Sequence, residues 1–470
     1  MENCSWELLF WLLSAIAINC FIQRLFWRRL KRQILLSLIP LYCLSQTCWL
    51  LLSVTLGGAV LRLLGASYVN LNEAGFRIAM GLTIMPIVAV SIALFFSCFD
   101  RDPVKLQVET QRDRRLMNII LGLFAASPFL YYVSSFLKVT LSQSASSIVC
   151  NVISYLHLSL FMTPALIGLY WRRYFIPVVV FLIAMLLTAV FAYSEGSRTL
   201  IFMPAVFFCV GVWVTLNWRL RSIALVIILV LAIPVFTLSA LIETVRREVR
   251  DSDAALWERI QGIGQLVFNE EWEGRQAEQL LQGVNRMIMQ ANIVVVCSTP
   301  EIVPYRGFET FLDECWNINR SGISGAKLED EEERLESDMG LGAARLYGFE
   351  IGIGGTVPFP VLADGWSRAG MLGVVLFCGI LCCFWGAAEH FARFWFAEKP
   401  HFAAAFIAIL ASSAYDRMGV YGFNYNLRYL VMQLALWSIV FYFVSRLSRV
   451  SISHRRLKAG HIRGIPEVKQ

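Results

Sequence analysis

The chain has 470 residues, of which 57% are hydrophobic and 16% are charged. Because a soluble globular domain carries about 25% charged residues, this composition excludes an ordinary soluble protein. The formal net charge of +7 does not require a nucleic-acid partner, since most basic residues flank apolar runs, where their charge orients membrane helices.

Apolar runs separated by charged joints predict an all-α, polytopic integral membrane protein with about 11 transmembrane helices. We expect an N-terminal transmembrane bundle at 1–242, further spans within 368–446 and a basic cytoplasmic tail at 447–470. Residues 243–367 lose the apolar character and are expected to form one large outer loop domain. The apolar runs lie at 8–22, 34–61, 76–99, 116–137, 148–170, 175–192, 200–216, 223–242, 371–388, 402–414 and 429–444.

The joints between the runs alternate between basic and basic-poor. Basic residues mark the joints at 28–32, 101–115, 172–173, 219–221 and 390–399, and also the C-terminal tail. Basic joints stay in the cytoplasm of multi-pass proteins. The alternation therefore predicts an outside N-terminus, an outside loop at 243–367 and a cytoplasmic C-terminus.

Arg198 lies in a joint of seven residues, 193–199, between two apolar runs. An arginine in mid-bilayer costs roughly 3 kcal/mol, so we expect Arg198 at an interface or in a wet cavity. A guanidinium can bind two phosphate oxygens at once, which favours a phosphate-bearing ligand. The alternative is that each arginine reaches lipid headgroups or pairs with a nearby acid. The other cations on the predicted outer face are Arg306, Arg320, Lys327, Arg345, Arg417 and Arg428.

A proton acceptor on the outer face is expected to be a carboxylate, with Glu195, Glu309 and Asp364 as candidates. Four of the five histidines fall on the cytoplasmic side of this topology, and His157 lies within a run, where we expect a packed, hydrogen-bonded side chain.

No CxxC motif or Cys/His cluster appears, so neither a metal nor a cofactor is expected. Cys297 and Cys315, in the predicted loop, are either two free thiols or one disulfide.

Five short stretches carry a family resemblance. They are Gly-Ser-Arg at 196–198, Tyr-Arg-Gly-Phe-Glu at 305–309, the glycine-rich 352–355, Ala-Asp-Gly-Trp at 363–366 and Gly-Met-Leu-Gly at 370–373. Their order resembles that of bacterial O-antigen polymerases and related oligosaccharide repeat-unit polymerases. Members of that family often carry Glu where Asp364 stands.

The resemblance implies a membrane-embedded glycosyltransferase of polysaccharide biosynthesis in a bacterial inner membrane. Such an enzyme transfers a growing glycan from undecaprenyl diphosphate to the terminal sugar of the next lipid-linked repeat unit, at the periplasmic face. The implied partners are the undecaprenyl-diphosphate-linked oligosaccharide, membrane lipid, a chain-length regulator and other polysaccharide-assembly proteins, without nucleic acid.

In this reading Arg198 and some of the other six outer cations bind the lipid diphosphate, whose charge grows in the transition state, without a metal. Glu195, Glu309 or Asp364 accepts the proton of the attacking hydroxyl. Aromatic side chains suit sugar stacking, although core packing explains each of them equally well: Tyr305, Trp316, Tyr347 and Trp366.

Three other classes stay open. An O-antigen-ligase-like transferase shares the lipid diphosphate donor, but that related family relies on an outer-face histidine, which the predicted topology lacks. A polysaccharide transporter or flippase predicts internal pseudo-symmetry, and no matching half is visible here. A structural membrane partner without catalysis is the third alternative.

Overall fold

The computed structural model describes residues 6–30, 33–55, 71–99, 118–129, 175–194 and 360–395, together with single residues at 133, 157, 160, 161, 204, 208, 305, 307, 308, 407, 439, 442, 443 and 446. Within these residues the regular structure is entirely helical and contains no strand, as the sequence predicts. Most of the 11 predicted spans and most of the predicted loop at 243–367 lie outside the described residues.

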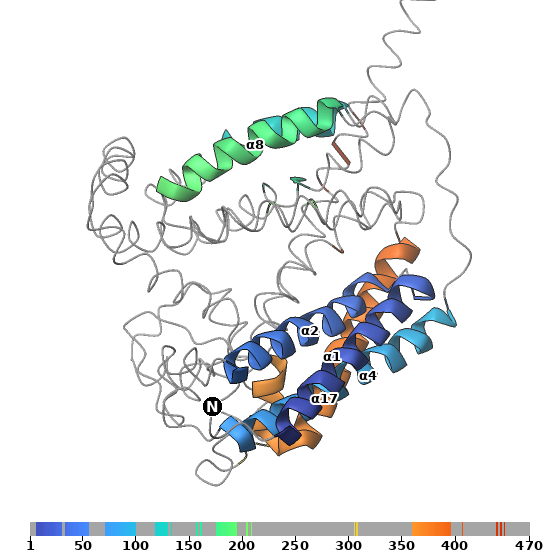
Figure 1. Ribbon diagram of the computed structural model, residues 1–470. Helices are drawn as coiled ribbons and strands as arrows, with labels where there is room; N and C mark the ends of the chain where they lie inside the picture. Colours follow the sequence, from blue (N-terminus) through green and yellow to red (C-terminus); the bar gives the residue numbers. More distant parts are fainter. Residues whose placement is uncertain are drawn as a thin grey trace, which may run out of the picture.

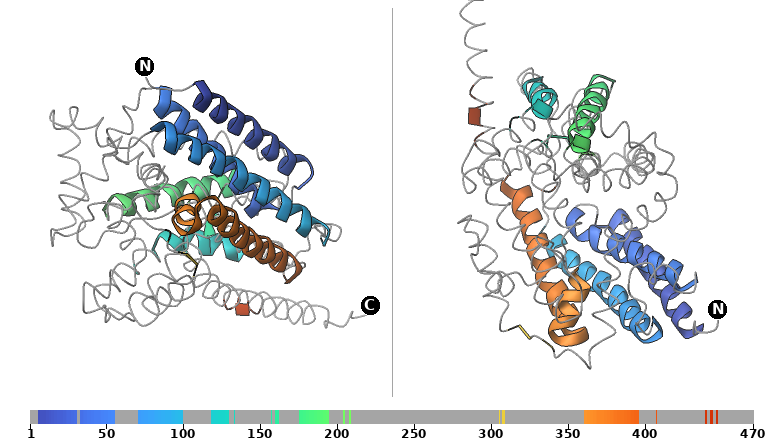
Figure 2. Two further views of the ribbon diagram at one scale, coloured as in Figure 1. Left: turned by 90° about the horizontal axis from the view of Figure 1, so that it is seen from below. Right: turned by 90° about the vertical axis from the view of Figure 1, so that its left-hand side faces the viewer.

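Among the described residues, four helices are long and apolar enough to cross a membrane. They are α1 (Trp6–Arg28), α2 (Ile34–Thr55), α4 (Leu71–Ser97) and α17 (Val361–Trp395). They lie side by side as one bundle, and α8 (Phe175–Ser194) lies apart from it (Figures 1 and 2). Each of the five helices overlaps one of the predicted apolar runs, and a bundle of long apolar helices is the architecture expected of a helical membrane protein.

Small residues let the bundle helices approach closely. Gly75 of α4 faces Leu8 of α1, Gly81 faces Leu362 of α17, and Gly386 of α17 faces Phe96 of α4. Close approach at small residues is how membrane helices gain packing energy, because lipid offers apolar side chains no hydrophobic penalty. Together with the hydrogen bond from Asn19 of α1 to the Leu82 carbonyl of α4, these contacts show that α1, α4 and α17 run in the same direction.

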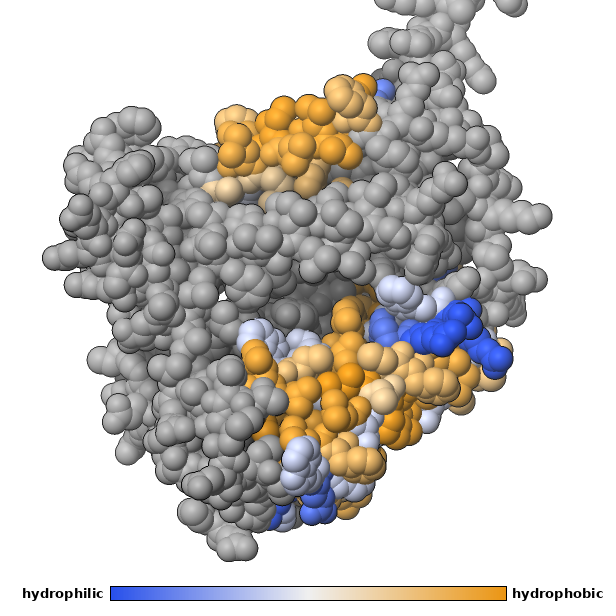
Figure 3. Space-filling view, in the orientation of Figure 1, coloured by the Kyte–Doolittle hydropathy of each residue, from blue (hydrophilic) through white to orange (hydrophobic). Residues whose placement is uncertain are grey.

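The outward faces of the bundle are apolar. Exposed leucine, isoleucine and phenylalanine side chains occur on α1, α4 and α17, and α8 carries a separate apolar patch (Figure 3). The strongly hydrophilic residues of the bundle gather toward its ends (Figure 3). A surface of this kind suits a hydrocarbon environment, in which apolar side chains face lipid and charges stay near the interfaces.

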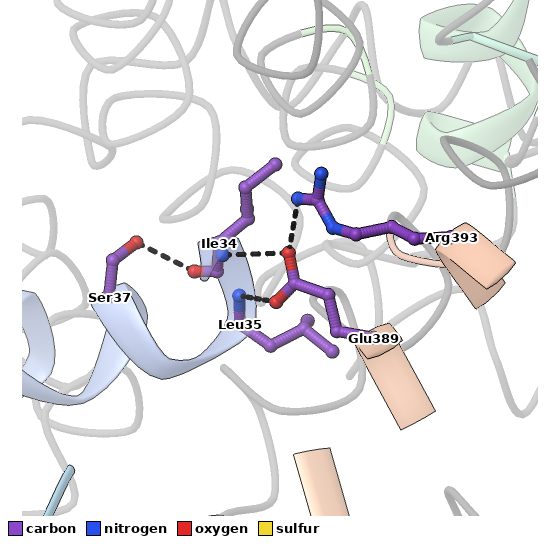
Figure 4. A network of polar contacts seen from close by, with 5 residues as sticks. All are labelled: Ile34, Leu35, Ser37, Glu389 and Arg393. Atoms are coloured by element: carbon purple, nitrogen blue, oxygen red, sulfur yellow. Dashed lines mark hydrogen bonds and ion pairs between the residues drawn. The ribbon is translucent and has the colours of Figure 1, made fainter. Parts of the chain in front are cut away.

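Glu389 of α17 joins α17 to the start of α2. Its two carboxylate oxygens accept hydrogen bonds from the backbone N–H groups of Ile34 (2.8 Å) and Leu35 (2.9 Å) (Figure 4). Its Oε1 also pairs with Arg393 Nη2 at 2.7 Å. The first N–H groups of a helix have no partner within the helix, so the buried carboxylate acts as a cap supplied from a distant segment.

This contact brings two basic joints to one end of the bundle. Arg28, at the end of α1, and Ile34 flank the first joint, and Arg393 belongs to the second. The described ends of the two joints therefore lie at one end of the bundle.

A second group of described residues surrounds His157. The rings of Phe124, Phe161 and Phe181 meet edge to face, and His157 packs its own edge against Phe161. His157 Nδ1 lies 2.9 Å from Ser127 Oγ, and Nε2 lies 3.3 Å from Thr188 Oγ1. His157 is fully buried, so it is the packed, hydrogen-bonded histidine that the sequence predicts.

We expect Glu389→Ala to destabilise the bundle by about 3 kcal/mol, because it leaves a partly buried guanidinium and two helix-terminal N–H groups without their acceptor. Thermal unfolding in detergent measures the loss. Glu7→Gln, at the exposed start of α1, is the control and should change little. Equal melting temperatures for Glu389→Ala and wild type would contradict the assigned role.

Candidate functional site

Asp364 is the one predicted catalytic or diphosphate-binding residue that the described part of the chain contains, together with the aromatic candidates Tyr305 and Trp366. The others lie outside the described residues: Glu195, Arg198, Arg306, Glu309, Arg320, Lys327, Arg345, Arg417 and Arg428. The candidate site is therefore built from Asp364 and its neighbours.

α17 is broken near its beginning. Ala369 (φ −155°, ψ 34°) and Gly370 (φ 59°, ψ −140°) leave helical geometry, and the helix resumes after them. The backbone of Gly370 occupies a region that side chains make costly, so the break depends on glycine. We call residues 361–368, before the break, the arm.

The arm folds back against the rest of α17. A Cβ atom on Gly373 would collide with the carbonyl oxygen of Gly365, so the two backbones touch. Every residue of the arm is buried. Residues 361–367, the end of the predicted loop domain, form a buried helical segment in which Asp364 pairs with Arg368.

Two opposite charges of the arm pair within it. Arg368 Nε donates to Asp364 Oδ1 at 3.2 Å, and the two side chains are 0% and 2% exposed. The residues are four apart, which places them on one face of the helix. Asp364 N also donates to the Pro360 carbonyl at 2.9 Å, so the first turn of the arm is held at both its backbone and its side chain.

Arg368 also binds a distant segment. Its Nη1 donates to the Gly307 carbonyl at 3.1 Å, and its own carbonyl accepts from Gly307 N at 3.0 Å. Its guanidinium carbon lies 5.8 Å from the ring centroid of Phe308. Tyr305 reaches the break itself, since a Cβ atom on Gly370 would lie 2.9 Å from the Tyr305 hydroxyl. We call Tyr305, Gly307 and Phe308 the docked segment.

A second arginine lies on the other side of the arm. The guanidinium carbon of Arg77, in the second turn of α4, is 6.0 Å from the ring centroid of Trp366, an arrangement that suits a cation–π interaction. Trp366 is only 6% exposed, whereas Arg77 is half-buried. Arg77 is thus the more accessible of the two cations.

The geometry indicates different roles for Asp364, Arg368 and Arg77. Asp364 is buried and paired with Arg368, which suits a positioning role better than proton transfer from an incoming hydroxyl. Arg368 holds the docked segment, and Arg77 presents a positive charge at the same end of the bundle. Such an arrangement suits an anionic group, which an arginine binds through two oxygens at once.

Sequence reasoning missed both Arg77 and Arg368. The signal for Arg368 is its spacing of four residues from Asp364, which pairs the charges on a helix but not in the predicted loop. The signal for Arg77 is that a charged residue stands second in the apolar run at 76–99.

Comparisons with protein-family models, with curated proteins and with solved structures find no match for this chain.

We expect Gly373→Ala to lower stability by about 1–3 kcal/mol, because the added methyl group collides with the Gly365 backbone. Gly379→Ala, on the same helix, meets nothing within 4 Å and should stabilise by about 0.5–1 kcal/mol, as alanine does in an open helix position. Thermal unfolding in detergent measures both. The same effect for both variants would contradict the close approach of the arm.

Proposed function

We propose that this protein is a polysaccharide polymerase. In this proposal it transfers a growing glycan from undecaprenyl diphosphate to the terminal sugar of the next lipid-linked repeat unit. The reaction takes place at the outer face of a bacterial inner membrane and needs no metal.

One observation carries the proposal beyond the sequence resemblance. Three of the stretches that carry the resemblance, at 305–309, 363–366 and 370–373, contribute residues to one place in the fold. Gly307 binds Arg368, and Tyr305 lies against Gly370. Stretches that serve one reaction are expected to meet, although 61 residues separate Gly307 from Arg368.

The reaction makes definite demands. The acceptor hydroxyl oxygen forms a bond to the anomeric carbon of the donor glycan, and the bond from that carbon to the diphosphate oxygen breaks. The diphosphate leaves with the electron pair, so negative charge grows on it in the transition state. A fixed cation that meets this charge accelerates the step. The hydroxyl proton passes to a carboxylate, for which Glu195 and Glu309 stay the candidates.

We assign the accessible Arg77 to the leaving diphosphate, beside Arg198 and the other cations proposed from the sequence. Asp364 and Arg368 are buried and hold each other, so they support this end of the bundle without touching the substrate.

We expect Arg77→Ala to lower turnover about 10²–10³-fold, the loss that follows removal of one group that stabilises transition-state charge. Arg198→Ala should abolish long polymer in the same way. The measurement is the length distribution of polymer made by the purified protein in vesicles from lipid-linked repeat units. Arg24→Gln, at the opposite end of the bundle, is the control. Long polymer from a folded Arg77→Ala variant would refute the role of Arg77.

Chelation tests the metal-independent part of the proposal. If arginines hold the diphosphate, we expect excess EDTA to leave the polymerisation rate unchanged in the same vesicles. A loss of activity that added Mg²⁺ or Mn²⁺ restores would show that a metal ion shares this task.

A further inference from the structure

We propose that Arg368 is a positioning residue that fixes Tyr305 at the break of α17, and that the exposed ring of Tyr305 is the surface on which the acceptor sugar stacks. The second half of this inference rests on the proposed function, and the first half does not.

The break in α17 leaves backbone carbonyl groups without hydrogen-bond donors, and the docked segment supplies one donor. Where a helix stops, its last carbonyl groups lack the N–H donors of the following turn, and in an apolar interior no water replaces them. Gly307 N donates to the Arg368 carbonyl at 3.0 Å, so the docked segment caps the arm. Gly307 does this with a φ of 69°, a backbone conformation that favours glycine.

The Arg368 side chain in turn donates a hydrogen bond to Gly307 and holds the docked segment in place. Its Nη1 donates to the Gly307 carbonyl while its Nε pairs with Asp364, so one rigid guanidinium joins the arm to the docked segment. The Phe308 ring lies over the same guanidinium. Because Arg368 is fully buried, its role is to orient the segment and not to contact substrate.

The docked segment in turn places Tyr305. The Tyr305 hydroxyl lies against Gly370, where any side chain would push it away. The residue is nevertheless 52% exposed, so part of its ring is available. Trp366, the other described aromatic candidate for sugar stacking, is 6% exposed and lies against Arg77. Of these two, Tyr305 has the free aromatic surface that a sugar requires.

The chain offers a matched control for Arg368. Arg393 lies on the same helix and also pairs with a carboxylate four residues earlier, Glu389, but its end of α17 contacts α2 and not the docked segment. A lysine keeps the charge at either position, but its single nitrogen cannot serve two acceptors in the geometry of a guanidinium.

The first experiment follows backbone amide exchange of peptides covering 305–309 in the purified full-length protein. We expect Arg368→Lys to speed this exchange at least tenfold, and Arg393→Lys to leave it at the wild-type rate. Unchanged exchange in a folded Arg368→Lys protein would overturn the positioning role. An equal rise in both variants would overturn it too, because the effect would then be general destabilisation.

The second experiment measures polymerisation with a soluble repeat-unit glycoside as the acceptor. We expect Tyr305→Ala and Arg368→Lys to raise the KM for this acceptor about tenfold with kcat changed less than threefold, and Tyr305→Phe to retain the wild-type KM, because stacking needs the ring. An unchanged KM in Tyr305→Ala would overturn the acceptor role. A wild-type protein without polymerase activity would refute the proposed function and the acceptor role together, while the exchange result would still decide the positioning role.

Discussion

The described fold depends on buried acid–arginine pairs of α17 that bind the backbone of distant segments. Glu389 and Arg393 form one pair, and Asp364 and Arg368 form the other, each with a spacing of four residues. A buried charge is costly unless it is paired and hydrogen-bonded, and each pair meets this condition. Each then supplies what a distant backbone lacks: Glu389 accepts from the first N–H groups of α2, and Arg368 donates to Gly307. In this way α17 connects segments that are far apart in the sequence.

The positions of the long helices follow from simple patterns in the sequence. Apolar runs fix α1, α2, α4 and α8 because a span must be apolar along most of its length. The start of α17 is different. The apolar run begins at 371, but the helix already begins at Val361. The run begins later because Asp364 and Arg368 lower the local hydropathy, although the two charges neutralise each other in the fold. A hydropathy average treats each residue independently and ignores the pairing of opposite charges, so it places this segment outside the predicted apolar run.

The candidate site was harder to predict for a related reason. The charge and aromatic content of the outer joints pointed to Asp364 and Tyr305, and both lie at the break of α17. Arg77 and Arg368 were missed because their significance arises only when α4, the arm and the docked segment meet. A sequence read without its relatives carries no signal for contacts between positions 61 residues apart, such as Gly307 and Arg368. Glycines at 365, 370 and 373 are visible in the sequence, but their reasons are not: Gly365 and Gly373 allow two backbones to touch, and Gly370 has a positive φ beside Tyr305.

Arg368 and Arg77 lie at the same end of the bundle, and their different burial, not their residue type, indicates different roles. Arg368 is buried, and its guanidinium contacts Asp364, the Gly307 carbonyl and the Phe308 ring in place of water. Its charge therefore serves to stabilise the fold. Arg77 rests on Trp366 and is only partly buried, so its guanidinium is more accessible to an anion than that of Arg368. Breaking a buried ion pair leaves an uncompensated charge and costs about 3–5 kcal/mol, which a ligand would have to supply from its own binding energy. A ligand that bound Arg368 would have to break its pair with Asp364, so this buried arginine suits a positioning role, whereas the more accessible Arg77 suits contact with an anion.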